Sequence, residues 1–170
     1  MTNNKKITLK VIIVGEPAVG KTSLVKKYVS GQFNRDYKAS IGTNIYTKRI
    51  PLEDNKNVSL QLWDIAGQER WINIRRSYYS GAKGILIVGD LTRKNTFDQI
   101  ERFWVLDIMN YCSSIPIILL ANKDDLSNKL EKEEIFSLGK RIKAKEVLFT
   151  SAKTGDNVEF AFSLISKYAI

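Results

Sequence analysis

Residues 7–22 read ITLKVIIVGEPAVGKT, and this stretch decides the fold class. Its first half, residues 7–14, is nearly continuous in β-branched and apolar residues, which is typical of a strand buried on both faces. Its second half matches the pattern G-x-x-x-x-G-K-[ST], and residues 21–30 are predicted to form a helix. The pattern therefore lies between a strand and a helix, which is the context that phosphate binding requires.

The loop after this strand has the chemistry of a phosphate cradle. Successive backbone N–H groups can point at phosphate oxygens, and the dipole of the following helix favours negative charge there. The Lys21 ammonium would reach the β- and γ-phosphates, and the Thr22 hydroxyl would bind Mg²⁺. Pro17 has no N–H, so the cradle must use the other amides. A glycine-rich turn that only begins a helix is the alternative. The expected nucleotide-binding residues of this segment are Gly15, Ala18, Val19, Gly20, Lys21, Thr22 and Ser23.

The rest of the chain alternates between buried strands and helices. This alternation predicts an α/β fold with a mainly parallel six-stranded sheet, helices on both faces and one antiparallel edge strand. Neither a repeat nor a Pro/Ser-rich linker is visible, so residues 1–170 are expected to form a single domain. In such sheets ligands bind beyond the carboxyl ends of the strands, which places the expected site after residues 14, 64, 90, 121 and 150. Strands are predicted over residues 7–14, 43–52, 57–64, 84–89, 115–121 and 146–150, and helices over 21–30, 95–110 with Thr92 as N-cap, 131–143 and 156–168.

Composition excludes several classes of chemistry. The chain has no histidine, which excludes a Ser-His-Asp triad and a histidine zinc site. Cys112 is the only cysteine, so no internal disulfide can form and a reducing, cytoplasmic setting is expected. The formal charge of +9 could favour binding to nucleic acid, an anionic membrane surface or a phosphate-bearing ligand. Alternatively, it could reflect lysines on the solvated surface. Because no nucleic-acid-binding motif accompanies this charge, a nucleic-acid partner is not expected.

Two short segments follow the last two predicted strands. Asn122, Lys123 and Asp125 follow one, and Ser151-Ala152-Lys153 follows the other. These segments resemble the guanine-recognition motifs of the small GTPases, and the resemblance implies that Asp125 faces the base. A carboxylate there can accept hydrogen bonds from the guanine N1–H and exocyclic amine, whereas adenine presents an acceptor at N1. Burying a carboxylate against that acceptor costs several kcal/mol, so a preference for guanine is expected.

The resemblance to the small GTPases also implies a three-layer P-loop NTPase G domain that binds GTP and GDP with Mg²⁺. It implies that the Ala152 N–H meets the guanine O6, that Lys123 packs on the base and that Phe33 lies against the base edge. Ordinary core packing would also explain Phe33. Further nucleotide-binding positions implied by the resemblance are Tyr37, Asn122, Ser151 and Lys153.

The segment Trp63-Asp64-Ile65-Ala66-Gly67-Gln68 resembles the Asp-x-x-Gly-Gln segment of the same family. The resemblance implies that Asp64 holds Mg²⁺ through water, that the Gly67 N–H bonds the γ-phosphate, and that Gln68 orients the attacking water, with Lys21 as the second catalytic residue. Ser40 stands where the family has a threonine that completes the Mg²⁺ shell. Residues 33–42 and 65–78 would then order and disorder with the γ-phosphate.

Within the small GTPases the chain is most similar to the Rab branch, through residues 62–64 (LWD), 66–71 (AGQERW) and 77–82 (SYYSGA). The resemblance covers residues 7–168. It implies a GTP-hydrolysing switch, acting in membrane traffic as a monomer. Effectors, an exchange factor and a GTPase-activating protein would bind residues 33–46 and 65–80.

Departures from the Rab pattern leave alternatives open. Ile45 stands where Rabs carry a phenylalanine, and the chain shows no prenylation or myristoylation site. The cluster Lys140, Arg141, Lys143 and Lys145 could contact an anionic membrane surface, or be a solvated helix face. No residue of these motifs matches an arginine finger, so hydrolysis should be slow. Substitutions around the phosphates support the alternative of a nucleotide-binding interaction module with negligible hydrolysis. These substitutions are Pro17, Ala18, Ser40 and Ile65.

Overall fold

The computed structural model describes residues 7–34, 42–51, 57–67, 72–127 and 129–170. Within these residues six strands form one sheet in the order β2-β3-β1-β4-β5-β6. The strands are β1 (Ile7–Val14), β2 (Thr43–Pro51), β3 (Asn57–Ile65), β4 (Gly84–Asp90), β5 (Ile117–Asn122) and β6 (Glu146–Thr150).

The pairing of the strands is mainly parallel. β1 pairs in parallel with β3, where Ile13 lies opposite Asp64, and with β4. β4 pairs in parallel with β5, and β5 with β6. β2 is the antiparallel edge strand and runs against β3 from Thr43 opposite Ile65 to Pro51 opposite Asn57. The predicted sheet is confirmed in strand number, direction and edge; the connection that closes the hairpin, residues 52–56, lies outside the described residues.

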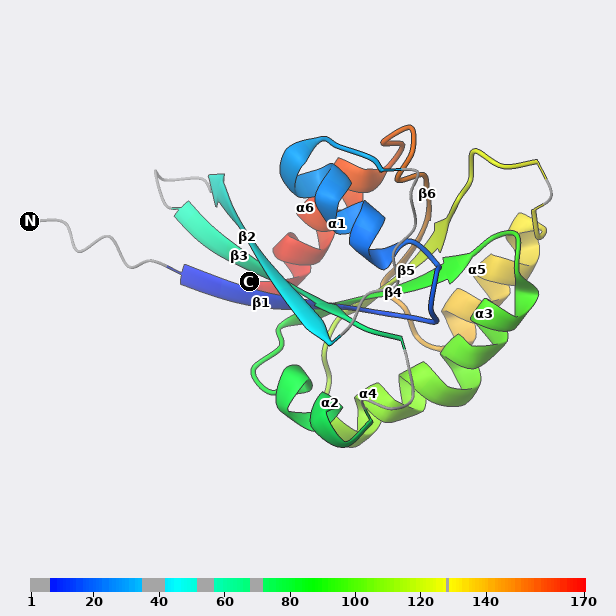
Figure 1. Cartoon of the computed structure of the whole chain (residues 1–170). Coiled ribbons are helices and arrows are strands. Elements are labelled where there is room, and N and C mark those ends of the chain that lie inside the picture. The colour runs from blue at the N-terminus through cyan, green and yellow to red at the C-terminus, as the bar shows by residue number, and fades with distance from the viewer. Residues whose placement is uncertain (1–6, 35–41, 52–56, 68–71, 128) are drawn as a thin grey trace, which may run out of the picture.

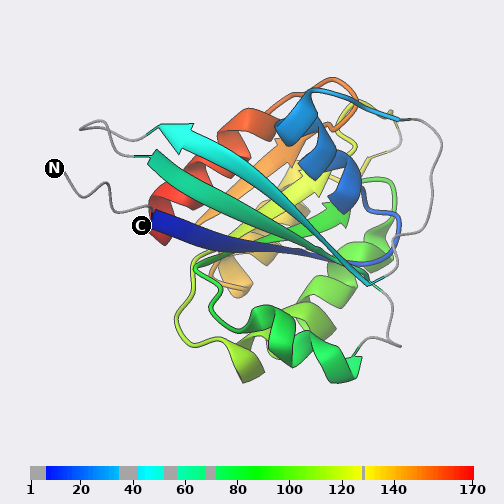
Figure 2. The same cartoon turned by 60° about the vertical axis from the view of Figure 1, so that its left-hand side comes forward.

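Helices cover both faces of the sheet, as predicted. Figures 1 and 2 show helices packed on either face of the sheet. The first face carries α1 (Lys21–Ser30) and α6 (Val158–Ala169). The other face carries α2 (Ile72–Tyr79), α3 (Lys94–Gln99), the π-helical turn η3 (Ile100–Trp104), α4 (Val105–Tyr111) and α5 (Lys132–Arg141).

The two hydrophobic cores follow from the alternation of side chains along the strands. Val11 and Ile13 of β1 belong to the cluster under α1 and α6, whereas Ile12 and Val14 belong to the cluster on the other face. All four are completely buried, which explains why the strand is apolar at nearly every position. The two cores hold β1 rigidly, and with it the start of the phosphate loop.

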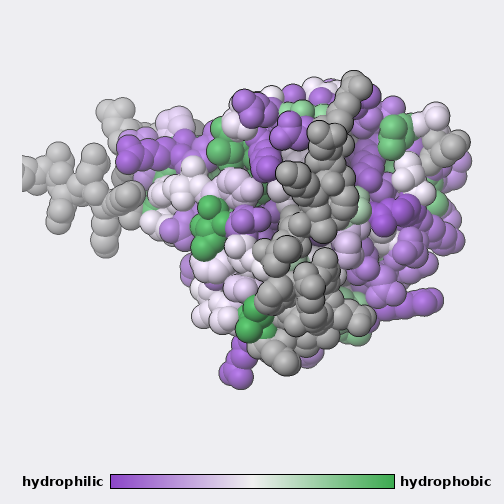
Figure 3. All heavy atoms as spheres, in the orientation of Figure 1, coloured by the Kyte–Doolittle hydropathy of each residue, from purple (hydrophilic) through white to green (hydrophobic). Residues whose placement is uncertain are grey.

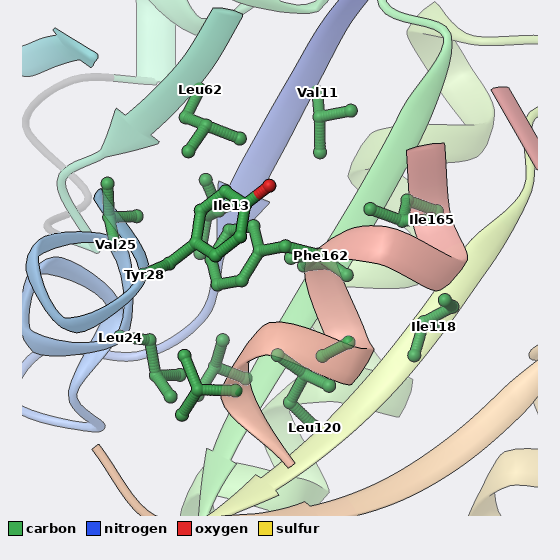
Figure 4. Packing of buried hydrophobic residues seen from close by; sticks show 14 of the residues in the cluster. Val11, Ile13, Leu24, Val25, Tyr28, Leu62, Ile118, Leu120, Phe162 and Ile165 are labelled. Carbon is green, nitrogen blue, oxygen red and sulfur yellow. The ribbon is translucent and has the colours of Figure 1, made fainter. Parts of the chain in front are cut away.

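The first core is closed by an aromatic pair (Figure 4). The Tyr28 ring of α1 stacks on the Phe162 ring of α6, with centroids 4.3 Å apart. Both rings lie over the sheet, beside Val11 and Ile13. Stacking of this kind is worth about 0.5–1.5 kcal/mol beyond the area buried. It joins α1, which follows the phosphate loop, to the last helix of the chain.

One predicted helix differs in detail from the observed structure. Residues 95–110 were expected to be a continuous helix, but a π-helical turn, η3, interrupts it between α3 and α4. The prediction of Thr92 as its N-cap is wrong: Arg93 precedes α3, and the Thr92 N–H and hydroxyl both donate to Asp90 Oδ1 instead. The buried carboxylate competes successfully for the Thr92 hydroxyl because a charged acceptor forms the stronger hydrogen bond.

On the face shown in Figure 3, hydrophobic residues form separate patches among hydrophilic ones. Among the residues that the structure describes, no helix has the length and apolar character needed to cross a membrane.

Candidate nucleotide-binding site

The phosphate loop connects β1 to α1 in a compact turn. Ala18 and Gly20 have positive φ angles of 63° and 101°, a backbone conformation that turns successive N–H groups toward one side. α1 begins after Gly20 without a side-chain cap from the described residues, which leaves its first N–H groups for an anion. This backbone geometry is compatible with phosphate binding by the loop, which remains a prediction.

Lys21 lies folded against this loop. Its Nζ donates to the carbonyls of Gly15 and Glu16, at 2.9 and 2.7 Å, and the residue is 6% exposed. Burial lowers the pKa of Lys21 to about 8, although the nearby Asp64 carboxylate acts in the opposite direction. The ammonium is thus held inside the loop with little solvent around it, where an anionic phosphate would stabilise its charge.

Asp64 lies beside Thr22 at the end of β3. The Thr22 hydroxyl donates to Asp64 Oδ2. Asp64 is completely buried, its Oδ1 has no hydrogen-bond partner among the described residues, and burial raises the pKa of its carboxyl. A buried carboxylate oxygen without a partner is costly unless a cation binds it.

The oxygen donors here fit Mg²⁺. A hydroxyl and a single carboxylate are the donor set that Mg²⁺ takes together with substrate phosphates and water. No group of three or more Asp, Glu, Cys or His side chains that could hold a metal occurs in the described part of the chain.

The Gly67 backbone packs directly on the phosphate loop. A Cβ added at Gly67 would lie 2.4 Å from the Gly15 carbonyl oxygen and 2.7 Å from the Pro17 nitrogen, so only glycine fits. This contact brings the segment after β3 to the edge of the loop. The use of the Gly67 N–H at the γ-phosphate remains a prediction.

The end of β5 joins the phosphate loop to β6. Asn122 Nδ2 donates to the Val19 carbonyl at 2.9 Å, and Thr150 Oγ1 donates to Asn122 Oδ1 at 3.1 Å. Asn122 and Thr150 are buried, so this link is shielded from water. The predicted phosphate and base segments are therefore joined by a direct side-chain contact.

Asp125 and Lys123 are both held by neighbours. The Ser151 hydroxyl donates to Asp125 Oδ1 at 2.7 Å, which fixes a carboxylate that is otherwise exposed. Lys123 has a positive φ of 68°, and its Nζ lies 2.7 Å from Asp90 Oδ2. Of the second segment, Ala152 is buried and Lys153 is exposed.

The structure brings most of the predicted site residues to the carboxyl end of the sheet. Phe33 is half-buried and packs against the core under α1 and α6, as the core-packing interpretation predicts. Tyr37, Ser40 and Gln68 lie outside the described residues.

Sequence reasoning missed three residues that touch these loops. Trp104 Nε1 donates to Glu16 Oε1 at 2.9 Å, and Arg93 Nη2 donates to the Pro17 carbonyl at 2.9 Å. Asp90 receives Lys123 and Arg93 on the same oxygen, Oδ2. The available signal was an aspartate at the carboxyl end of an otherwise apolar strand, since a charge there needs a partner.

Comparison with known proteins identifies the family. A family model described as the Ras family matches residues 10–170. The chain belongs to the Ras family, in its Rab branch. It is 36% identical over 177 residues to the Ypt/Rab-type GTPase YPT7 of Saccharomyces cerevisiae, covering 100% of this chain and 85% of the relative. It is 38% identical over 176 residues to the Ras-related protein Rab7 of Drosophila melanogaster, covering 100% of this chain and 84% of that protein.

Membership of this family confirms the general function predicted from the motifs. The chain is a Rab-like GTP-binding switch and a GTP hydrolase, with GTP and GDP as its ligands. The alternative of an interaction module with negligible hydrolysis is not favoured. Effectors, exchange factors and GTPase-activating proteins are the partner classes of the family.

Proposed function

We propose that this single domain, residues 1–170, binds the nucleotide across the carboxyl end of the sheet. The phosphates would lie in the loop of residues 15–23 and the guanine between residues 122–125 and 151–153. Mg²⁺ would be held by Thr22, Ser40 and, through water, Asp64. The observation that carries this assignment is the buried Asn122 link between the two segments, because it places them next to each other.

Each side chain then has a defined part in hydrolysis. The Lys21 ammonium and the loop amides stabilise negative charge on the phosphoryl oxygens, and Gln68 orients the attacking water. Gly67, whose backbone packs on the phosphate loop, would donate its N–H to the γ-phosphate. A bound Mg²⁺ supplies further neutralisation of the β- and γ-phosphate charge.

The segments 33–46 and 65–80 are proposed as the surface for effectors and regulators. Ile45 of β2 is 53% exposed and pairs with Trp63 of β3, and the Trp63 and Tyr78 rings lie 6.3 Å apart. These side chains offer apolar contact area beside the γ-phosphate end. We further propose that the protein acts in membrane traffic as a cytoplasmic monomer, peripheral to membranes.

Phosphate release in a single turnover tests the proposed catalytic role. Wild-type protein loaded with GTP should release phosphate slowly, and Gln68→Leu should slow that release by roughly 10- to 100-fold, since the attacking water loses its orienting group. The variant should retain wild-type affinity for GDP, which serves as the control. Unchanged phosphate release in Gln68→Leu would contradict this role for Gln68.

A further inference from the structure

The loop after β4 contacts both ends of the proposed nucleotide site. Arg93 lies between them: its Nη2 donates to the Pro17 carbonyl at 2.9 Å and its Nε donates to Asp90 Oδ2 at 3.0 Å. The same Asp90 oxygen lies 2.7 Å from Lys123 Nζ. A continuous chain of contacts therefore runs from the phosphate loop to the base-recognition segment through two side chains that neither motif contains.

Asp90 is ionised, and its surroundings stabilise that charge where it contacts both Arg93 and Lys123. It is 1% exposed, and its other oxygen accepts from the N–H and hydroxyl of Thr92. Burial acts to raise the pKa of Asp90, but hydrogen bonds from Lys123, Thr92 and Arg93 outweigh burial and hold the pKa below its usual value. An ionised, fully surrounded carboxylate has a fixed orientation, so it can transmit position from one partner to the other.

Arg93 connects Asp90 to the phosphate loop, and arginine is the side chain best suited to this role. Its planar guanidinium can donate from separate nitrogens to separate acceptors, which a lysine ammonium cannot do in the same fixed geometry. Pro17, which it contacts, has no N–H, so the loop lacks one backbone donor at the residue that Arg93 holds by its carbonyl. The contact fixes the position of the Pro17 carbonyl from outside the loop.

We propose that Arg93 and Asp90 are positioning residues that fix the phosphate loop relative to the guanine-recognition segment. This inference rests on the proposed nucleotide site. It adds an outer link to the inner, buried link made by Asn122 to Val19. Loss of the contacts of Arg93 and Asp90 should weaken binding of the phosphates. Through Lys123 it should also reduce the preference for guanine over other bases.

The effect on base preference distinguishes two roles for Arg93: a link to the base-recognition segment, or support of the phosphate loop alone. Trp104 also supports the loop, on its phosphate side, because its Nε1 donates to Glu16 Oε1. Trp104→Phe should therefore speed dissociation of all nucleoside diphosphates alike. Arg93→Gln should affect a guanine nucleotide more than one whose base makes fewer contacts.

Dissociation of fluorescent GDP and fluorescent inosine diphosphate, which lacks the exocyclic amine, provides the test. Arg93→Gln is expected to raise the GDP dissociation rate about tenfold and to lower the preference for GDP over inosine diphosphate about threefold. Arg93→Lys should behave like Arg93→Gln, because it keeps the charge and loses the fork. Lys94→Gln is the matched control: it removes the neighbouring charge, whose partner is Glu134, and should leave both values within about twofold of wild type.

Other outcomes overturn the inference. Restoration of wild-type behaviour by Arg93→Lys would show that charge alone matters. An unchanged base preference in Arg93→Gln, or an equal fall in Trp104→Phe or Lys94→Gln, would remove the proposed link to the base. Failure of wild-type protein to bind GDP would overturn the proposed site itself, and this inference with it. Tight wild-type binding with unchanged Arg93 variants would overturn the inference alone.

Discussion

Replacing Asp125 with asparagine is expected to weaken GDP binding by roughly 10²- to 10³-fold and to shift the preference toward xanthosine diphosphate. The carboxylate would accept from the guanine N1–H and exocyclic amine, and hydrogen bonds to charged groups are each worth about 1.5–3 kcal/mol. An asparagine amide can instead donate to the carbonyl that xanthine carries in place of the amine. Ser151 holds Asp125 Oδ1 at 2.7 Å, so the substituted side chain should keep nearly the same position.

Competition between GDP and xanthosine diphosphate for a fluorescent nucleotide measures this shift. Asp124→Asn provides the matched control, since Asp124 is the adjacent acid and pairs with Lys129 at 2.9 Å instead of facing Ser151. The control should keep its preference for GDP. Retention of that preference by Asp125→Asn would place the base elsewhere than the segment 122–125.

Much of the fold was predictable because local patterns and tertiary structure agree. The apolar run 7–14 and the loop that follows it predicted β1, the turn and α1, and all three were found there. The alternation of Val11 and Ile13 with Ile12 and Val14 between two cores could not be assigned to particular helices beforehand. That assignment depends on which helix packs on which face, which the strand's own residues do not specify.

The residues of the candidate site also fall into two groups, those that belong to short sequence motifs and those that tertiary packing brings to the site. Residues within the short motifs could be proposed from the sequence: Lys21 from the phosphate-loop pattern, and Asp64 and Asn122 from the resemblance to the small GTPases. Arg93 and Trp104 could not, because their contacts join residues 76 and 88 positions apart in the chain. Trp104 reaches Glu16 from the end of η3, a π-helical turn in a segment whose apolar spacing predicted an uninterrupted α-helix. π-Helical turns often occur at functional sites, and this one supplies an indole donor to the phosphate loop.

Asp64→Asn is expected to speed GDP dissociation in the presence of Mg²⁺ by about 10- to 100-fold. Residues that hold a metal through water typically contribute this much to metal affinity or activity. The substitution keeps the shape of the side chain and removes its charge. Thr22 can still donate to the remaining oxygen, so the local fold should persist.

Dissociation of fluorescent GDP with and without a chelator separates the metal effect from a loss of packing. Wild-type protein should lose GDP much faster when Mg²⁺ is removed, whereas Asp64→Asn should dissociate rapidly in both conditions. Asp107→Asn is the control, because it removes the same charge on α4, where Asp107 accepts from the Tyr79 hydroxyl. A wild-type response to the chelator in Asp64→Asn would contradict the assignment.

The expected size of this effect follows from the burial of Asp64. The side chain is completely buried, with Thr22 on one oxygen and no partner among the described residues on the other. A carboxylate in that position destabilises the fold unless positive charge compensates it. The Lys21 and Lys26 ammonium groups and the Thr22 hydroxyl act to lower the pKa of Asp64, but burial outweighs them and raises it. Lys21 donates its hydrogen bonds to Gly15 and Glu16, so a cation bound at Asp64 would add compensation that these groups do not supply. Removing the charge of Asp64 should therefore affect nucleotide retention far more than stability.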